Sequence, residues 1–153
     1  MSLPQLKQVV AHNFVSATNA GTATSSVIDT MGFDWATIDI AATTQAASTQ
    51  AGSPSVLKIQ EADNTSATSF VDVVGFRGGS ATATNVDFVV GIGVTSGVNN
   101  YKFNVDCRAR KRYLSVVVSP TTTQTFVSVA NLGRGEIAPV SATKANVLNL
   151  VEG

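Results

Sequence analysis

Only a few side chains in this sequence could take part in catalysis or hold a metal ion. The 153 residues include a single histidine, His12, and a single cysteine, Cys107. They are too few for a zinc site of the Cys/His type, and a hydrolytic triad would need His12 beside a serine and an orienting acid. No Gly-x-Ser-x-Gly sequence occurs. We therefore interpret His12 as an ordinary surface or arm histidine, and we predict no enzyme, no metal site and no cofactor.

The carboxylates also lack the spacing of a known site. Asp63 follows Glu61 and precedes Asn64, which gives several oxygen ligands within four positions. A calcium site needs six to eight oxygens, and this spacing matches no EF-hand. An Asp-Asn pair is typical of a turn. We therefore predict a turn at 63–65.

The strongest charge feature is a basic cluster, Arg108, Arg110, Lys111 and Arg112, in a chain whose formal net charge is zero. Three interpretations are open. The cluster could be a patch for an anionic partner, a salt-bridged protein interface, or a solvated basic turn whose arginine stems cover sheet edges. The zero net charge and the absence of interleaved aromatic residues argue against nucleic acid.

Two aromatic residues join the basic cluster as candidate interface residues. Trp35 is the only tryptophan. We interpret it as a core or interface anchor, because a single aromatic ring makes a weak platform for a sugar. Phe14 lies in an N-terminal segment of mostly small and polar residues, where it and Val15 are the anchors that we expect.

These residues must be positioned by a chain that is poor in charge and rich in small, β-favouring residues. Hydrophobic residues make up 44% and charged residues 13% of the chain, whose length suits one domain. Valine and threonine are frequent, and their β-branched side chains suit a pleated sheet. No apolar run reaches 18 residues, so we expect no membrane span. The N-terminus has no basic region followed by an apolar stretch, so we expect no secretory signal and synthesis in the cytoplasm.

Alternation of apolar and other residues predicts about eight strands. The clearest segments are 86–94 and 101–107, and Cys107 falls on the apolar side of the second, where we expect it to be buried. We expect further strands at 27–31, 35–40, 56–61, 69–74, 112–118 and 126–130. No segment has a helical period. We predict an all-β, two-sheet sandwich, a jelly roll of about eight strands, with an immunoglobulin-like sandwich as the alternative.

The domain organisation that we expect is a β-sandwich between two arms. Residues 1–24 include a run of Ser, Thr, Ala, Asn and Gly that cannot bury much apolar surface. We therefore predict an N-terminal arm at 1–24, a sandwich domain at 25–135, and a C-terminal arm or tail at 136–153.

The order of several motifs resembles a known protein family. The motifs are Ser25–Asp34, Val56–Asp63, Lys111–Val118, Val127–Gly133 and Ala138–Val140. The series resembles small structural proteins encoded among the head genes of tailed bacteriophages, and it covers roughly residues 25–140. The resemblance implies a virion protein on the capsid surface, a jelly-roll decoration or cement protein. Its implied partners are the major capsid protein and further copies of itself, as a homotrimer, and it implies no catalytic residues.

Two other functions stay open at the level of sequence. A binding module on a phage fibre or spike could recognise a carbohydrate of the host, with Trp35 in contact with the sugar. A hydrolase that uses His12 is the weakest alternative, because no partner serine or acid can be assigned to it.

Overall fold

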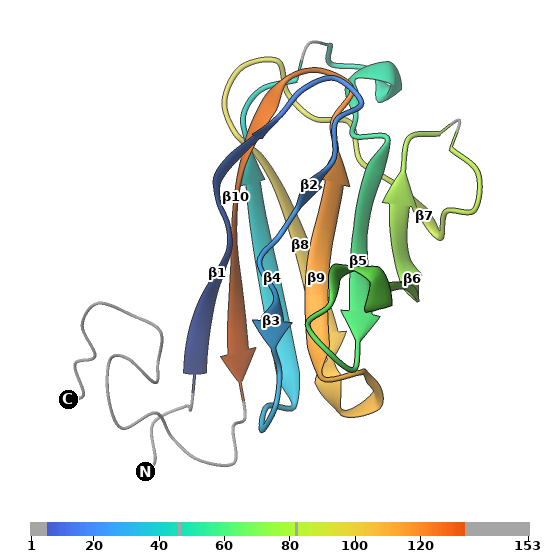
Figure 1. The fold of residues 1–153 in the computed structure, drawn as a ribbon. Coiled ribbons are helices and arrows are strands. Elements are labelled where there is room, and N and C mark those ends of the chain that lie inside the picture. The colour runs from blue at the N-terminus through green and yellow to red at the C-terminus, as the bar shows by residue number, and fades with distance from the viewer. Residues whose placement is uncertain (1–5, 46, 82, 134–153) are drawn as a thin grey trace, which may run out of the picture.

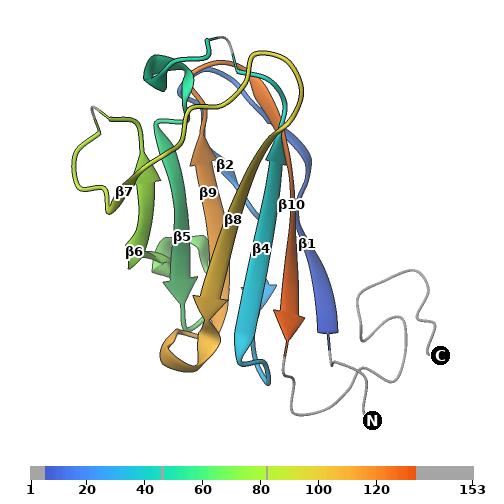
Figure 2. The same ribbon diagram turned by 180° about the vertical axis from the view of Figure 1, so that it is seen from behind.

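The computed structural model describes residues 6–133 except residues 46 and 82, and it shows two β-sheets packed face to face (Figures 1 and 2). The strands are β1 (Leu6–Ala17), β2 (Ala23–Thr24), β3 (Ile28–Asp29), β4 (Trp35–Ala42), β5 (Val56–Ala62), β6 (Val71–Gly79), β7 (Phe88–Val89), β8 (Asn99–Asp106), β9 (Tyr113–Ser119) and β10 (Gln124–Gly133). Three short 3-10 turns join them: η1 (Gln50–Gly52), η2 (Ala67–Ser69) and η3 (Cys107–Ala109). The predicted all-β, two-sheet sandwich is confirmed.

The sheet order identifies the sandwich as a jelly roll. One sheet has the order β1-β10-β4-β8, and the other has the order β2-β9-β5-β6-β7, with β3 also paired to β9. The pairs are nested: β1 pairs with β10, β2 and β3 pair with β9, β4 pairs with β8, and β5 pairs with β6. A long hairpin of such nested pairs, rolled up into two sheets, is the jelly-roll arrangement. The immunoglobulin-like alternative is therefore wrong.

The core lies between the sheets and is built from alternate residues of each strand. In β4, Ala36, Ile38, Ile40 and Ala42 are buried, and the residues between them are more exposed. The strands β8 and β10 repeat this pattern, and β5 and β9 supply the opposite wall. Truncating Ile38 to alanine would cost about 2–5 kcal/mol, because the cavity would not close completely. This rigid core fixes the positions of the loops and of the two outer faces.

The strand β9 is buried on both faces from Leu114 to Ser119. It lies at the centre of its sheet, with β5 on one side and β2 and β3 on the other. Between β2 and β3, Ser25 bonds to Val116: its amide donates to the Val116 carbonyl at 2.9 Å, and its hydroxyl accepts from the Val116 amide at 2.9 Å. The break between β2 and β3 therefore leaves no backbone group of Val116 without a partner.

The N-terminal arm predicted at 1–24 differs from the structure over its described part. Leu6–Ala17 forms β1, an edge strand in antiparallel register with β10 from Leu6–Gly133 to Ala17–Gln124. Two register shifts, between Val10 and His12 and between His12 and Val15, break the alternation that would have revealed a strand. Residues 1–5 and the C-terminal arm predicted at 136–153 lie outside the described residues.

The strand predicted at 86–94 is also wrong for most of its length. Only Phe88 and Val89 pair, in parallel with Gly78 and Gly79 of β6. Beyond them the chain leaves the sheet, and Ile92 and Val94 are exposed rather than buried. The segment 101–107 behaves as predicted as far as Asp106, with Phe103 and Val105 in the core. No helix among the described residues is long and apolar enough to cross a membrane.

Candidate interaction surfaces

The basic cluster lies at one end of the sandwich, where η3 joins β8 to β9, and each of its cations faces a carboxylate. Arg112 binds Asp29 in bidentate fashion at 2.9 and 2.7 Å, and Arg108 binds Asp106 in the same way at 2.9 and 2.7 Å. Lys111 Nζ lies 3.2 Å from Asp63, and Arg110 lies 4.0 Å from Glu61. We call this end, with its four cations and their carboxylates, the ion-pair collar.

Two of the collar acids, Asp106 and Asp29, are held in the charged form by their partners. The Arg108 side chain lowers the pKa of Asp106 to about 2, and the Arg112 side chain lowers the pKa of Asp29. Exposed pairs of this kind contribute little to stability, because water and salt screen them. The pairs matter more for the binding of a partner than for stability, because cations that are already neutralised attract an anionic partner only weakly. Of the three interpretations of the cluster, the free anion-binding patch has the least support.

Trp35 belongs to the same end of the molecule. It begins β4, where it lies opposite Gly133 of β10 and Asp106 of β8, and its exposed fraction is 37%. The Arg108 guanidinium lies over the indole ring at 4.9 Å from the ring centre, an arrangement that favours cation–π attraction. The ring therefore packs beneath the collar, and a sugar that stacked on this ring face would have to displace Arg108.

His12 is not a surface or arm residue, because it is fully buried in β1. Its Nδ1 lies 2.7 Å from the Ser128 hydroxyl of β10, and the same hydroxyl accepts a 2.9 Å bond from the His12 amide. Nε2 has no hydrogen-bond partner among the described residues. Burial lowers the pKa of His12, and the backbone of Ala23 opposes this shift. Sequence reasoning missed the His12–Ser128 pair, because 116 residues separate its members.

Cys107 and the turn after Asp63 behave as the sequence predicts. Cys107 is a free, buried cysteine, and burial, with Asp106 and Asp34 nearby, raises the pKa of its thiol to about 11. The segment after Asp63 is a turn, in which the Asn64 side chain accepts bonds from the Ser66 amide and the Ser69 hydroxyl. Within the described residues, no group of three or more His, Cys, Asp or Glu side chains is placed to hold a metal ion.

The outer face of the four-stranded sheet is a second surface, which the sequence did not reveal. Residues opposite one another in the register share a face, so Val10 of β1, Val129 of β10, and Asp39 and Lys102 of β4 and β8 form one row across the sheet. Asp39 and Lys102 pair at 3.2 Å. A shallow groove of about 280 Å³ runs beside this row, lined in part by Ala41 and Val127. Apolar side chains thus meet solvent across the middle of this face, which we call the outer face.

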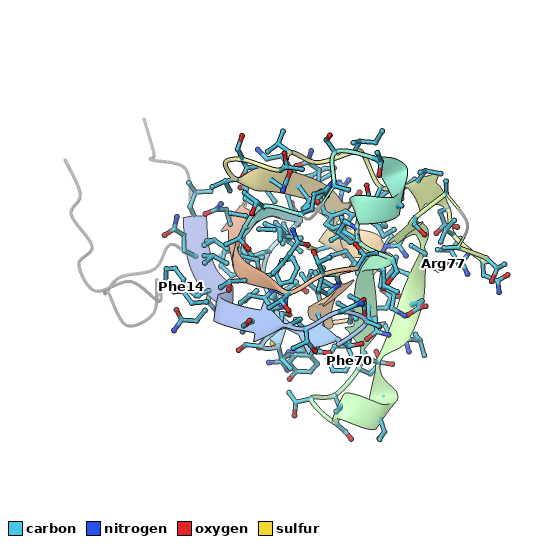
Figure 3. All side chains as sticks on the ribbon, turned by 90° about the horizontal axis from the view of Figure 1, so that it is seen from above. Phe14, Phe70 and Arg77 are labelled. Carbon is cyan, nitrogen blue, oxygen red and sulfur yellow. The ribbon has the colours of Figure 1, made fainter. Side chains whose placement is uncertain are left out.

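Phe14 projects from the edge of the outer face, and its backbone conformation is unusual. The side chain is 75% exposed, and Figure 3 shows it at the periphery of the molecule, beside β1. Its φ is +51°, in the left-handed region that bulky residues avoid. Such a conformation costs about 1–3 kcal/mol and persists only where the surrounding structure imposes it. The second register shift in β1, between His12 and Val15, contains Phe14 and is the local cause.

The candidate interface residues therefore fall into two groups. The structure brings Trp35 together with the basic cluster at the ion-pair collar, and it places Phe14 on the edge strand β1. The apolar row of the outer face could be found only from the register of β1, β10, β4 and β8. The sequence did contain one signal for this surface, the alternation in β4 and β10. The residues between the buried ones in these strands must lie on the outer face of the sheet.

Comparisons with known proteins place the chain in no family. No family model matches it, and no curated protein matches it. One similar solved structure is described as the structure of infectious bursal disease virus, Gx strain; the sequence identity is 14% and the TM-score is 0.46. The likeness covers 90% of this chain and 35% of that one. Values this low carry no argument about function.

Proposed function

We propose that this chain is a structural protein of a bacteriophage virion, a decoration or cement protein that binds the major capsid protein lattice from outside and reinforces it. The proposal keeps the homo-oligomer that the motif series implies, a trimer. It is supported by the order of the motifs and by the jelly-roll sandwich. A rigid two-sheet scaffold in a chain with only 13% charged residues suits a protein that makes broad protein contacts.

The observation that carries the proposal is the exposed, strained phenylalanine beside the outer face, on which valines lie next to polar and paired charged side chains. Aromatic anchors at the centre of an interface contribute much of its binding energy. Phe14 is held away from the core at a conformational cost, and Val10 of the same strand is 47% exposed. In this proposal the outer face lies against the capsid shell, and Phe14 enters a pocket of the capsid protein.

The test uses phage particles that lack this protein and purified chain added back to them. We expect the wild-type chain to sediment with the particles and to raise the temperature at which they release DNA. The Phe14→Asn variant should bind about tenfold more weakly or worse, because the anchor is lost. Asparagine tolerates a positive φ, so the fold of this variant should be as stable as the wild type or more stable.

The matched control is Met31→Asn, which removes an apolar side chain of similar exposure, 66%, at the collar end of the molecule. This variant should bind like the wild type. If the wild-type chain neither sediments with the particles nor raises their stability, the capsid function is wrong. If the Phe14 and Met31 variants bind equally well, the outer face is not the capsid contact.

A further inference from the structure

Four loops at the end of the sandwich opposite the ion-pair collar carry no charge, whereas the connection after β6 at the same end contains Asp87, which pairs with Arg77. Four connections meet there: residues 18–22, 43–55, 90–98 and 120–123 (Figures 1 and 2). None of them contains Asp, Glu, Lys, Arg or His, although 13% of the chain is charged. We call these four loops the crown. The crown therefore has no formal charge, whereas the opposite end carries the four cations and four carboxylates of the collar.

Hydrogen bonds tie the crown loops to one another in series. The Ala20 amide donates to the Pro120 carbonyl at 2.9 Å, and the Thr121 hydroxyl donates to the Gly52 carbonyl at 2.8 Å. The Ser53 hydroxyl reaches the Gly91 carbonyl at 3.1 Å, which joins the second loop to the third. The four loops thus form one connected surface rather than four separate segments.

Buried amide side chains hold the crown from below. Asn99 and Gln124 both donate to the Thr43 carbonyl, at 3.2 and 2.7 Å, and the Asn99 oxygen accepts from the Val94 amide at 2.6 Å. A side chain at position 93 would collide with the Asn99 and Gln45 side chains, which would have to move from their present positions. A surface held in this way loses little conformational entropy when it binds a partner.

The crown also exposes apolar side chains. Ile92, Val94 and Val98 are 59%, 46% and 60% exposed, and all three lie in the loop 90–98. Threonine, serine, alanine and glycine surround them in the neighbouring loops. An apolar centre with an uncharged polar rim is the composition of a protein interface, since the centres of interfaces are depleted of charged residues.

We propose that the crown is the surface through which copies of this chain contact one another about a rotation axis. Near such an axis each residue approaches its own counterpart, so a charged residue would meet a like charge. A surface without charges avoids this repulsion, and the zero net charge removes repulsion between whole copies. A different partner is usually selected through complementary charge, and the crown offers none. The inference rests on the homo-oligomer of the proposed function and names its contact surface, but it does not depend on the capsid.

The test measures the self-association of the full-length chain by sedimentation velocity over a range of concentrations. We expect the wild type to associate equally at low salt and in 1 M NaCl, where charges are screened within about 3 Å. Val98→Glu should weaken association about tenfold or more, because it places like charges close together at the contact, within reach of solvent ions. Part of this loss should be recovered in 1 M NaCl, which a misfolded variant would not show.

The matched control is Val74→Glu, the same substitution at a valine of β6 that is 69% exposed and lies outside the crown. It should associate like the wild type. A chain that stays monomeric at its highest soluble concentration overturns the inference, and so does a Val98→Glu variant that associates as well as Val74→Glu does. Because no capsid is present in this experiment, either result leaves the binding of the chain to particles as a separate question.

Discussion

His12 shows how a residue type that suggests chemistry can serve the core. Its ring is fully buried, its Nδ1 bonds to Ser128, and it lies 6.4 Å from the ring centre of Phe126. A substrate could reach this Ser–His pair only if β1 left the sheet. The pair therefore joins β1 to β10 inside the sandwich. Its role is to stabilise the fold.

The buried ring predicts that stability depends on pH near neutrality. The folded-state pKa of His12 is below that of the unfolded chain because burial disfavours the charged ring. The unfolded state therefore binds the extra proton first, so stability is highest above about pH 6.5 and falls as the pH decreases towards the folded-state pKa. One proton gives a slope of at most about 1.4 kcal/mol per pH unit.

Urea unfolding at pH 7.5, 6.5 and 5.5 would measure this slope. In His12→Asn the slope between pH 6.5 and 5.5 should disappear, while an amide group in place of the ring can still bond to Ser128. An Asn variant that loses stability with falling pH as steeply as the wild type would show that another group titrates. Carboxylates are poor alternatives in this range, since their ordinary pKa values lie near pH 4.

At the scale of elements, the main difference between the sequence prediction and the structure is β1. It is a strand paired with β10, where the sequence predicted an arm. It covers one edge of β10 and contributes Ala11, His12 and Ala17 to the interior. We expect that a chain lacking residues 1–17 will not fold, because Phe126 and Ser128 would lose their neighbours and β10 would become an exposed, partly apolar edge.

Circular dichroism during heating would test this expectation. The truncated chain should show no cooperative transition, whereas full-length Phe14→Asn, which changes the same strand without removing it, should melt as sharply as the wild type. A truncated chain that melts like the full-length protein would mean that β1 is an arm laid on a complete domain, as the composition of residues 1–24 first indicated.

The sequence predicted most of the strands and the jelly roll, and its failures have common physical causes. Alternation or runs of apolar, β-branched residues predicted β4, β5, β8, β9 and β10, because each of these strands has a partner on both sides or faces the core over its whole length. Alternation failed at 86–94, where apolar residues alternate but the chain leaves the sheet after Val89. Gly91 and Gly93 lie in the part that has left the sheet. It also failed at β1, where two bulges shift the alternation. Alternation reports which residues could share a face, but it does not report whether a neighbouring strand is present.

The candidate sites were harder to predict, because they depend on residues that are distant in sequence. The basic cluster is easily recognised in the sequence. The charges of Arg110 and Arg112 are neutralised by Glu61 and Asp29, which lie near them only in the folded chain. The charge-free crown is likewise invisible until the topology places four separate loops at one end. Charge and its absence became informative only when the strand order was known.

At the scale of the whole molecule, the ion pairs of the collar and the uncharged loops of the crown predict that the two ends will respond differently to acid. The pKa values of Asp29 and Asp106 are lowered by Arg112 and Arg108, that of Asp106 to about 2. A carboxylate with a lowered folded-state pKa contributes stability that is present above its unfolded-state value, near pH 4, and is lost as the pH falls through the folded-state value. Between pH 4 and pH 2, the collar should therefore loosen while the crown, which has no ionisable side chain in its loops, should not.

Hydrogen exchange at pH 4 and at pH 2.5, corrected for the intrinsic rates, would compare the ends within one molecule. Peptides covering 26–35 and 105–113 should lose protection at the lower pH, and peptides covering 43–55 and 90–98 should keep theirs. Equal loss at both ends would mean that acid acts through the net charge of the whole chain. Loss at the crown alone would contradict the prediction, because the collar would then have kept its ion pairs in acid. Only the predicted pattern is consistent with a molecule whose collar is held by ion pairs and whose crown is held by neutral hydrogen bonds.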